Sequence, residues 1–458
     1  MKSRISFFDR ATFKKDITRF LPLWVLYTVF LLLCMIPTAA GSSYYSHPAR
    51  ALNNSLSGLT MANLLYAALS AQLLFGELFN SRLCNALHAM PMTREARFGS
   101  HILAGILFAW IPNLLTTVLM MPYLGSMWYT CLLWLAVCSL QYLFFFGAAV
   151  FSVMCTGSRF AMVLVYGIIN FLAIAVFWFV DTIYRPLMPG VQLDASFLST
   201  FCPTVQMIAE NDYFFLSVSP STVYIDSRDA AFGGLGEDWP YLFIVAGVGI
   251  AAIAVSLLMY RKRKLESAGD FIAVRWIEPI FLVLYTLCAG AFLAVFSGLF
   301  GNEAYIVFLS LGIVIGFFTG KMLLERTTRV FRKKNFLLAG IFVVAMLFSL
   351  VPIQNDWFGI VRYVPDAQDV EYVQVYGYEI SRSKLTEPED IELVCQIHDC
   401  AIENLDHDNE NTCRGAHYYT SIEYHLKNGQ TVTRRYYICN DSVAGDLWTQ
   451  LIKIITKK

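Results

Sequence analysis

Residues 98–157 read FGSHILAGILFAWIPNLLTTVLMMPYLGSMWYTCLLWLAVCSLQYLFFFGAAVFSVMCTG, and this stretch contains no Asp, Glu, Lys or Arg. A helix that crosses a bilayer needs roughly 20 predominantly apolar residues. The stretch is long enough for two such helices, with a tight turn near Pro122–Gly125 between them. It therefore predicts two consecutive membrane-spanning helices.

The rest of the chain supports the same class. It is 57% hydrophobic and only 15% charged, whereas soluble domains carry about a quarter of charged residues. The formal net charge is zero, so no basic excess indicates nucleic acid. We expect an all-α polytopic membrane protein with about nine transmembrane helices, at 21–40, 59–78, 102–122, 127–151, 160–180, 240–260, 276–299, 303–320 and 336–353.

The distribution of Lys and Arg predicts the orientation. Alternate connecting segments, beginning with the N-terminal one, hold 21 basic residues, while the intervening loops hold only Arg50, Arg185 and Arg228. Because basic residues are retained in the cytoplasm, we expect the N-terminus inside and, with nine spans, the C-terminal domain outside. The first apolar run follows a long basic segment and is of spanning length, so we expect a retained helix rather than a cleaved signal peptide.

The segments outside the spans divide the chain further. Residues 1–20 predict an interfacial amphipathic helix, with Ile5, Phe8, Phe13, Ile17 and Phe20 toward acyl chains and basic residues toward anionic headgroups; a merely topogenic basic segment is the alternative. The acidic outer loop 181–239 contains apolar clusters between 197 and 217 that predict short helices dipping toward the bilayer, or else a solvated linker. Residues 261–353 add three spans with basic cytoplasmic loops.

The span at 303–320 carries Gly312, Gly316 and Gly320. Two consecutive Gly-x-x-x-Gly spacings give a smooth face on which another helix packs closely. Intramolecular packing is the default interpretation and dimerisation the alternative.

Residues 354–458 predict a small α+β extracytoplasmic C-terminal domain. Thr386 and Glu389 form a capping-box pattern before a helix with Ile391, Val394, Ile397, Ala401 and Leu405 on its inner face. The runs 418–426 and 430–439 flank Asn428-Gly429, a strong hairpin signal.

Four cysteines lie in this domain: Cys395, Cys400, Cys413 and Cys439. An even set outside the cell favours disulfides. Reduced thiols are an alternative, and so is zinc, although the spacing with His398 matches no standard zinc motif. We predict no metal and no cofactor.

Ion-coupled transport and intramembrane hydrolysis need ionisable or nucleophilic groups inside the membrane, and the spans carry no ionisable side chain near a midplane. Glu77, Asp181, Glu278 and Glu303 all fall at span ends, where headgroups and water can solvate them. A P-loop is also missing, since the fragment Gly316–Met322 has the wrong glycine spacing and no Ser or Thr after Lys321. The chain is thus not expected to be an enzyme, and energy for any transport must come from another protein.

The segment Asn80–Arg97, NSRLCNALHAMPMTREAR, is a polar segment between two spans and is longer than a simple turn requires. It has room for an amphipathic helix, which indicates a docking surface on one side of the membrane. A solvated basic loop that only fixes topology is the alternative.

Four stretches carry a resemblance to a known family: FFDRATFKKDITRFLPLW, RLCNALHAMPMTREARFGSHILAG, YRKRKLESAGD, and LTEPEDIELVCQIH together with SIEYHLKNGQTVTRRYYI. The chain resembles the permease subunits of ABC-2 type ABC transporters, in particular large permeases of Gram-positive bacteria linked to cell-envelope stress. The resemblance implies an elbow helix, a six-helix core over residues 21–260 and a cytoplasmic coupling helix within 80–97. The three further spans and the outer domain depart from that core.

The resemblance also implies partners and contact residues. A separate cytosolic ATPase would dock on the coupling helix, and the permease would pair with an identical or homologous second permease in the cell membrane. Pro91 would end the coupling helix. Leu83, Leu87 and Met90 would supply apolar anchoring, and Arg82, His88, Arg94 and Glu95 the polar contacts.

Two other function classes remain open. One is a membrane-anchored sensor whose C-terminal domain binds an extracellular ligand, and the other is an assembly protein without an ATPase. The apolar spans are compatible with lipid, peptide or antibiotic-like substrates, and export is expected only by analogy to the family.

Overall fold

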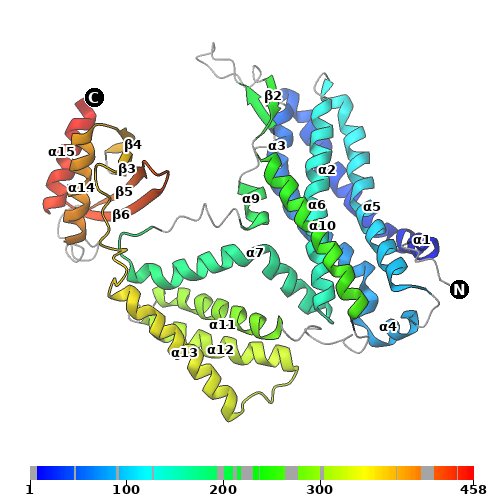
Figure 1. The fold of residues 1–458 in the computed structure, drawn as a ribbon. Coiled ribbons are helices and arrows are strands. Elements are labelled where there is room, and N and C mark those ends of the chain that lie inside the picture. Colours follow the sequence, from blue (N-terminus) through cyan, green and yellow to red (C-terminus); the bar gives the residue numbers. More distant parts are fainter. Residues whose placement is uncertain are drawn as a thin grey trace. The chain divides into compact units, whose positions relative to one another are not determined.

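The computed structural model describes residues 8–45, 48–88, 92–125, 128–192, 201–209, 214–217, 231–236, 238–263, 277–299, 304–377, 379–403, 417–440 and 442–457 (Figure 1). The chain divides into two compact units. The first comprises residues 1–174 with 198–281, and the second comprises 175–197 with 282–458.

The first unit begins with the short helix α1 (Arg10–Arg19), which is capped by Asp9. The Asp9 carboxylate accepts a hydrogen bond from the Thr12 amide at 2.7 Å, and this bond lowers the pKa of Asp9. Phe13, Ile17 and Phe20 pack against the helix bundle rather than facing only lipid. The expected amphipathic helix forms, but much of its apolar face is used for packing within the protein, while its lysines and Arg19 are exposed.

Long helices build the rest of this unit. Its secondary-structure elements are α2 (Leu21–Tyr45), α3 (Pro48–Leu74), η1 (Gly76–Phe79), α4 (Ser81–His88), α5 (Arg94–Met120), η2 (Met121–Tyr123), α6 (Tyr129–Cys155), the first part of α7 (Arg159–Tyr184), α9 (Pro203–Ala209), β1 (Phe214–Ser217), β2 (Ala231–Leu235) and α10 (Trp239–Lys262). A glycine pair allows α6 and α10 to approach closely, because a Cβ on Gly147 would lie 2.2 Å from the Gly249 carbonyl oxygen. The predicted turn between 98 and 157 is present as η2.

Within residues 181–239, one short helix forms in the predicted apolar region. This helix, α9, is held by Thr204, whose hydroxyl donates to Asn170 Oδ1 at 3.3 Å, and by the Ile208 carbonyl, which accepts from Ser57 at 3.2 Å. β1 and β2 pair antiparallel. Much of 181–239 lies outside the described residues, and so does Glu303.

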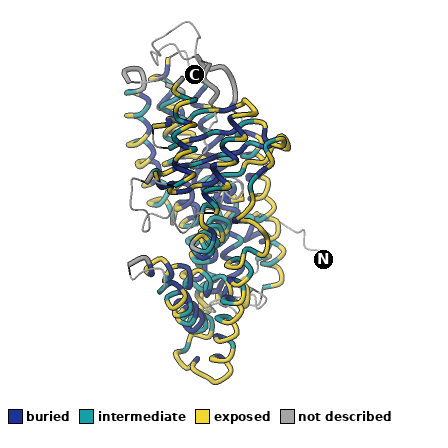
Figure 2. Tube along the Cα trace, turned by 90° about the vertical axis from the view of Figure 1, so that its left-hand side faces the viewer, coloured by how far each residue is buried: buried dark blue, intermediate teal, exposed yellow. Residues whose placement is uncertain are grey.

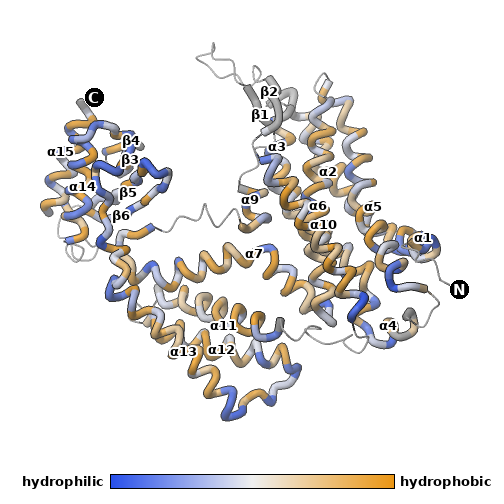
Figure 3. Tube along the Cα trace, viewed as in Figure 1, coloured by the Kyte–Doolittle hydropathy of each residue, from blue (hydrophilic) through white to orange (hydrophobic). Residues whose placement is uncertain are grey.

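Eight described helices are long and apolar enough to cross a membrane: α2, α5, α6, α7, α10, α11, α12 and α13. The chain is therefore a multi-pass membrane protein by length and composition of its helices. The helix α3 occupies the place of the expected second span, but it is not among the eight, since its first half is rich in Asn and Ser. Figure 3 shows hydrophobic residues along the helices of both units and hydrophilic residues at the connection between α12 and α13.

The second unit contains the end of α7, η4 (Arg185–Leu187), most of α11 (Ile277–Val295), η6 (Phe296–Leu299), α12 (Tyr305–Glu325) and α13 (Lys333–Gln354). Tyr305 donates a hydrogen bond to the Ile183 carbonyl at 2.5 Å, and Tyr184 and Ser349 share a bond of 2.9 Å. These contacts tie the end of α7 to α12 and α13. In both units, buried and exposed residues alternate along the helices, as Figure 2 shows.

A small α+β domain completes the second unit. Its strands are β3 (Val370–Gly377), β4 (Ile380–Leu385), β5 (His417–Leu426) and β6 (Thr431–Cys439), in the antiparallel order β4-β3-β5-β6, with helices α14 (Pro388–Glu403) and α15 (Val443–Lys457). The hairpin forms around Gly429 (φ 83°) as its Asn-Gly signal predicts. The start of α14 is corrected: Pro388 is the first helical residue, and the Ile391 amide bonds the Glu387 carbonyl, so Glu387 occupies the cap in place of Thr386.

The end of α7 is followed by a short extended segment that pairs with β6. The Arg435 amide donates to the Gly190 carbonyl at 2.9 Å, and the Gln192 amide donates to the Thr433 carbonyl at 3.4 Å. Gly190 has φ 77°, and a Cβ there would lie 2.1 Å from the Tyr436 ring, so only glycine fits. The segment Gly190–Gln192 therefore attaches this domain to the end of α7.

Candidate functional site

The polar segment between the second and third expected spans forms a helix, α4. Asn80 caps it, because its side-chain oxygen accepts from the amides of Arg82 and Leu83 at 3.1 and 3.4 Å. Arg82 and Leu83 are exposed, with Leu83 at 41%, while Cys84 is buried beneath the helix. Burial raises the pKa of the Cys84 thiol, and the nearby Arg263 charge acts in the opposite direction.

The side chains of three predicted docking residues, Leu87, His88 and Met90, lie outside the part of the chain that the structure describes. Leu87 and His88 belong to α4, but their side chains, like Met90 and Pro91, lie outside the described residues. Of the predicted docking residues on α4, the structure thus describes Arg82 and Leu83 as exposed.

Arg94, expected at the docking surface, instead binds the end of another helix. Its guanidinium Nη1 donates to the carbonyls of Tyr260, Arg261 and Arg263 at 3.3, 3.1 and 3.1 Å. Cations stabilise helix C-termini because the last carbonyls lack partners within the helix. The Arg94 side chain therefore joins the start of α5 to the end of α10.

Glu95 makes a second connection between the same helices. Its carboxylate lies 3.1 Å from Arg261 Nε, with the two side chains 24% and 42% exposed. An exposed pair of this kind contributes little on its own. Together with Arg94, it nevertheless fixes which part of α10 faces α5.

Arg263, in the basic run after α10, is placed by its hydrogen bonds. Its guanidinium donates to the carbonyls of Val153 at 2.8 Å, Met154 at 3.2 Å and Thr156 at 2.8 Å, at the end of α6. It also reaches the Leu78 carbonyl in η1 at 3.4 Å. Arg263 therefore closes the end of α6 and connects it to the segment that leads into α4.

A cluster of charged side chains is buried beside these connections. His101 Nδ1 lies 2.6 Å from Asp16 Oδ2, and Glu77 Oε1 lies 3.7 Å from both Arg97 Nη1 and His101 Nε2. The side chains of all four are at most 9% exposed. The expectation that headgroups and water solvate Glu77 is wrong, because this carboxylate is buried against two basic groups.

Sequence reasoning missed this cluster because its members come from three separate segments. Arg97 and His101 are four residues apart on α5, so they share one helix face. This spacing of Arg97 and His101, together with the acidic Glu77 at the end of the preceding span, was the sequence signal that could have predicted the cluster. A buried charged side chain is stable only beside a group of opposite charge, and each acidic side chain of this cluster has a basic partner.

A cavity of about 300 Å³ adjoins the cluster. It is bounded by α1, the end of α3, η1 and Leu83 of α4, and by the start of α7. Its inner residues include Asp16, Glu77, Arg97 and His101, whereas Lys15, Arg19 and Arg159 are exposed.

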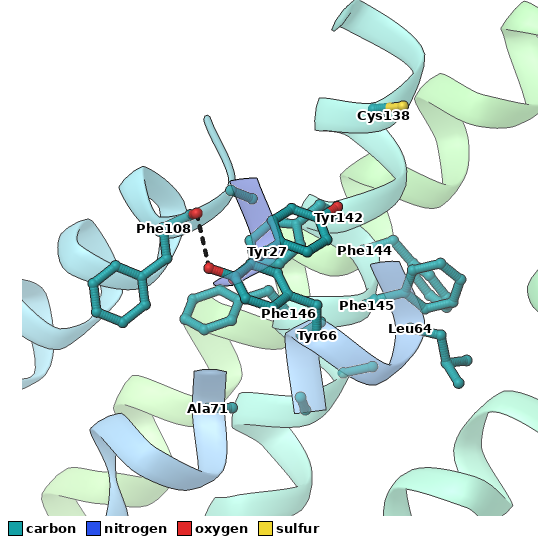
Figure 4. Packing of buried hydrophobic residues seen from close by; sticks show 14 of the residues in the cluster. Tyr27, Leu64, Tyr66, Ala71, Phe108, Cys138, Tyr142, Phe144, Phe145 and Phe146 are labelled. Carbon is teal, nitrogen blue, oxygen red and sulfur yellow. Dashed lines mark hydrogen bonds between the residues drawn. The ribbon is translucent and has the colours of Figure 1, made fainter. Parts of the chain in front are cut away.

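The interior of the first unit holds a second polar group, which is uncharged. Tyr27 and Tyr66 stack with ring centroids 3.8 Å apart, and Tyr27 donates to Asn63 Oδ1 at 2.7 Å. Asn63 Nδ2 in turn donates to Gln141 Oε1 at 3.3 Å. Figure 4 shows Tyr27, Tyr66 and Tyr142 among buried aromatic residues, with Tyr66 bonded to the Phe108 carbonyl at 2.9 Å.

These neutral side chains did not stand out in the sequence, because a search for charged residues passes over Tyr, Asn and Gln. Inside a membrane bundle, however, polar groups are costly and often line substrate pathways. The chain of Tyr27, Asn63 and Gln141 gives the apolar bundle hydrogen-bonding capacity without any net charge.

In the C-terminal domain, Cys439 is disulfide-bonded, while Cys395 and Cys400 carry thiols. Cys413 lies outside the described residues. Cys395 is buried on α14, and its Sγ donates to the Pro365 carbonyl at 3.6 Å. Cys395 and Cys400 therefore form no disulfide with each other. No group of three or more His, Cys, Asp or Glu that could hold a metal is found among the residues that were described.

His398 is fully buried in the same domain and bonded to two tyrosine hydroxyls, Tyr424 at 3.2 Å and Tyr436 at 2.9 Å. Burial, with a smaller contribution from the Arg434 charge, lowers the pKa of His398 to about 3. A neutral imidazole between two hydroxyls fills its hydrogen bonds as a core residue and offers no ligand position to zinc.

The glycine face of α12 contacts α11. A Cβ on Gly312 would lie 2.8 Å from the Ala289 carbonyl oxygen, and one on Gly316 would lie 2.5 Å from the Ala289 Cβ. At Gly320 the nearest atom, in Leu282, would be 3.0 Å away. The structure thus places all three glycines at an intramolecular helix contact.

No protein-family model, curated protein or solved structure matches this chain. The arrangement of its own residues must therefore support any function. What the geometry offers is a small exposed helix, α4, whose surroundings are bonded to the ends of α5, α6 and α10.

Proposed function

We propose that this protein is the permease subunit of an ABC-2-like transporter in the cell membrane, driven by a separate cytosolic ATPase that docks on α4. The observation that carries the proposal is the exposed apolar Leu83 on a short helix at the ends of the bundle helices. A solvated topogenic loop needs neither a capped helix nor an exposed leucine on it. The chain itself is proposed to have no catalytic activity.

The connections around α4 give a physical route for force. Arg263 bonds both Leu78, just before α4, and the end of α6. Arg94, just after α4, bonds the end of α10. A displacement of α4 would therefore reach α5, α6 and α10 together, since charged hydrogen bonds to helix carbonyls resist separation.

The proposal includes nine spans, with α3 as the second, an inner N-terminus and an outer C-terminal domain. The disulfide at Cys439 supports that orientation, because disulfides persist outside the cytoplasm. The buried, uncharged polar group of Tyr27, Asn63 and Gln141 is compatible with an amphiphilic lipid, peptide or antibiotic-like substrate, exported with the help of a second permease subunit.

The test is whether the ATPase co-purifies with the Leu83→Asp variant from the membranes of cells that express this variant. A charge at this position should remove most of the bound ATPase and of the ATP hydrolysis that elutes with the protein, while membrane insertion stays normal. Leu83→Met keeps the apolar contact and is the matched control. Arg94→Glu is unsuitable as a docking variant, since it would also release α10.

Full recovery of the ATPase with Leu83→Asp would contradict docking on α4. Failure to recover any ATPase with the unaltered chain would favour the assembly protein.

A sensor role is the second candidate, because Gly190–Gln192 joins the C-terminal domain to the end of α7. In that case ligand binding by the full-length protein would not depend on ATP hydrolysis. Equal ligand binding by an ATPase-deficient complex and by the active complex, with no transport by either, would favour the sensor.

A further inference from the structure

The cavity between α1, α3 and α7 has a positive rim that the proposed coupling does not use. Its lining includes Lys15, Arg19, Arg97 and Arg159 against the carboxylates of Asp9, Asp16 and Glu77. These lining residues comprise four permanent cations and three carboxylates. The cavity therefore has an excess of positive charge.

The acidic side chains are already occupied. Asp9 caps α1 through the Thr12 amide, Asp16 bonds His101, and Glu77 lies between Arg97 and His101. By contrast, Lys15, Arg19 and Arg159 form no ion pair with any residue in the part of the chain that the structure describes. Three exposed cations thus surround one opening with no acid of their own.

The floor of the cavity adds a polar atom. His101 is 3% exposed, and its Nε2 has no hydrogen-bond partner among the described residues. Its nearest acidic atom, Glu77 Oε1, is 3.7 Å away, which is beyond hydrogen-bonding distance. Glu77 is therefore a charge partner of this ring nitrogen without a close hydrogen bond, and the nitrogen adds a polar atom to the cavity floor.

The rim residues also stand at a boundary between charge and exposed apolar surface. Leu21, two residues after Arg19, is 46% exposed, and Phe160, next to Arg159, is 61% exposed. Basic side chains beside exposed apolar ones are typical of the level at which headgroups meet acyl chains.

We propose that this cavity binds a phosphate group, supplied by the headgroup of an acidic phospholipid, through Lys15, Arg19 and Arg159. The acyl chains would lie along the exposed apolar start of α2. A volume of about 300 Å³ is at the small end of ligand pockets and is sufficient for a headgroup. Lys15, Arg19 and Arg159 are not among the proposed ATPase contacts, although Leu83 lines the same cavity.

The experiment measures lipid retained by the full chain after purification from membranes that contain phosphatidylglycerol and phosphatidylethanolamine, using native mass spectrometry. Replacing Lys15 and Arg19 by Gln should lower the retained acidic lipid roughly 25-fold, taking about fivefold for each basic residue at a membrane surface. Arg10→Gln with Lys14→Gln removes the same charge from α1 outside the cavity and should leave retention unchanged.

A third variant, Ala11→Trp, fills the cavity without changing its charge and should also displace the lipid. Inorganic phosphate is the second arm. If it protects the delipidated chain against thermal unfolding as well as phosphatidylglycerol does, the lipid source is refuted in favour of a free anion. If the Lys15 and Arg19 variant and the Arg10 and Lys14 control lose equal amounts of acidic lipid, the basic residues attract lipid only through their general charge, and the proposal is overturned. Unchanged lipid retention in the Lys15 and Arg19 variant and in Ala11→Trp would also overturn it.

Discussion

Removing the Arg263 guanidinium should open the region around α4. Two of its bonds, to Val153 and Thr156, are 2.8 Å long, and the other two are weaker at 3.2 and 3.4 Å. A hydrogen bond to a charged group contributes about 1.5–3 kcal/mol, and the half-buried setting favours the lower value. The two short bonds then give about 3 kcal/mol, so Arg263→Ala should raise the population of locally open states roughly a hundredfold.

Two native cysteines report this opening. Cys84 and Cys155 are 1% and 0% exposed, and they lie in α4 and at the end of α6. Maleimide labelling followed by peptide mass spectrometry should show both thiols reacting much faster in Arg263→Ala. Loss of the Arg263 charge would raise the pKa of Cys84 and slow its labelling, so faster labelling cannot come from a more reactive thiolate.

Lys262→Ala is the matched control, because the neighbouring Lys262 is exposed. Arg263→Lys should give an intermediate rate, since one ammonium cannot bond carbonyls in two segments with the same geometry. Labelling of Cys84 and Cys155 at the unaltered rate in Arg263→Ala would refute the reasoning that this side chain holds η1 and α6 together.

Two further predictions concern the second unit. Gly316→Ala should lower the stability of the purified protein by about 1–3 kcal/mol in thermal unfolding, because the new Cβ would lie 2.5 Å from Ala289 Cβ. For His398, the pKa of about 3 in the folded state lies below the ordinary value of 6.5, so the unfolded chain binds the proton first as pH falls. The stability of the domain is therefore complete above pH 6.5 and should decrease by about 1.4 kcal/mol per unit below it, measured by hydrogen exchange of β5 and β6 corrected for the intrinsic rate.

Each of these predictions has a control within the chain. Gly340→Ala on α13 should change little, since a Cβ there meets nothing within 4 Å. An equal loss in Gly316→Ala and Gly340→Ala would contradict a specific effect of the contact with α11, because Ala by itself favours a helix over Gly. His398→Gln keeps a polar side chain without a titrating ring, and an unchanged pH dependence in this variant would assign the effect to another group.

Much of the architecture followed from local patterns. The apolar runs predicted the long helices because a spanning helix must satisfy its backbone internally over a fixed length. The Asn428-Gly429 pair predicted the hairpin, since Gly429 adopts a left-handed conformation that glycine tolerates. The strands β3 and β4 and the helix α15 were not anticipated.

The errors arose where tertiary contacts decide the role of a residue. Arg94 and Arg263 look like any basic residues beside a span, yet both bind the carbonyl ends of other helices. Glu77 lies at a span end, where sequence alone suggests water, but Arg97 and His101 from the next helix enclose it. Basic charge near a membrane predicts the side on which a segment lies and does not distinguish a headgroup contact from a helix cap.

The pairing of Gly190–Gln192 with β6 has a mechanical consequence for the second unit. The C-terminal domain follows α13 in the chain, and this pairing gives it a second attachment, at the end of α7. A domain with one attachment can rotate about it, whereas a domain attached at two separate points passes a force on to both of them. A force on this domain would therefore reach the end of α7 through Gly190–Gln192 as well as α13 through the chain, and the close fit of Gly190 beside Tyr436 keeps that second contact tight.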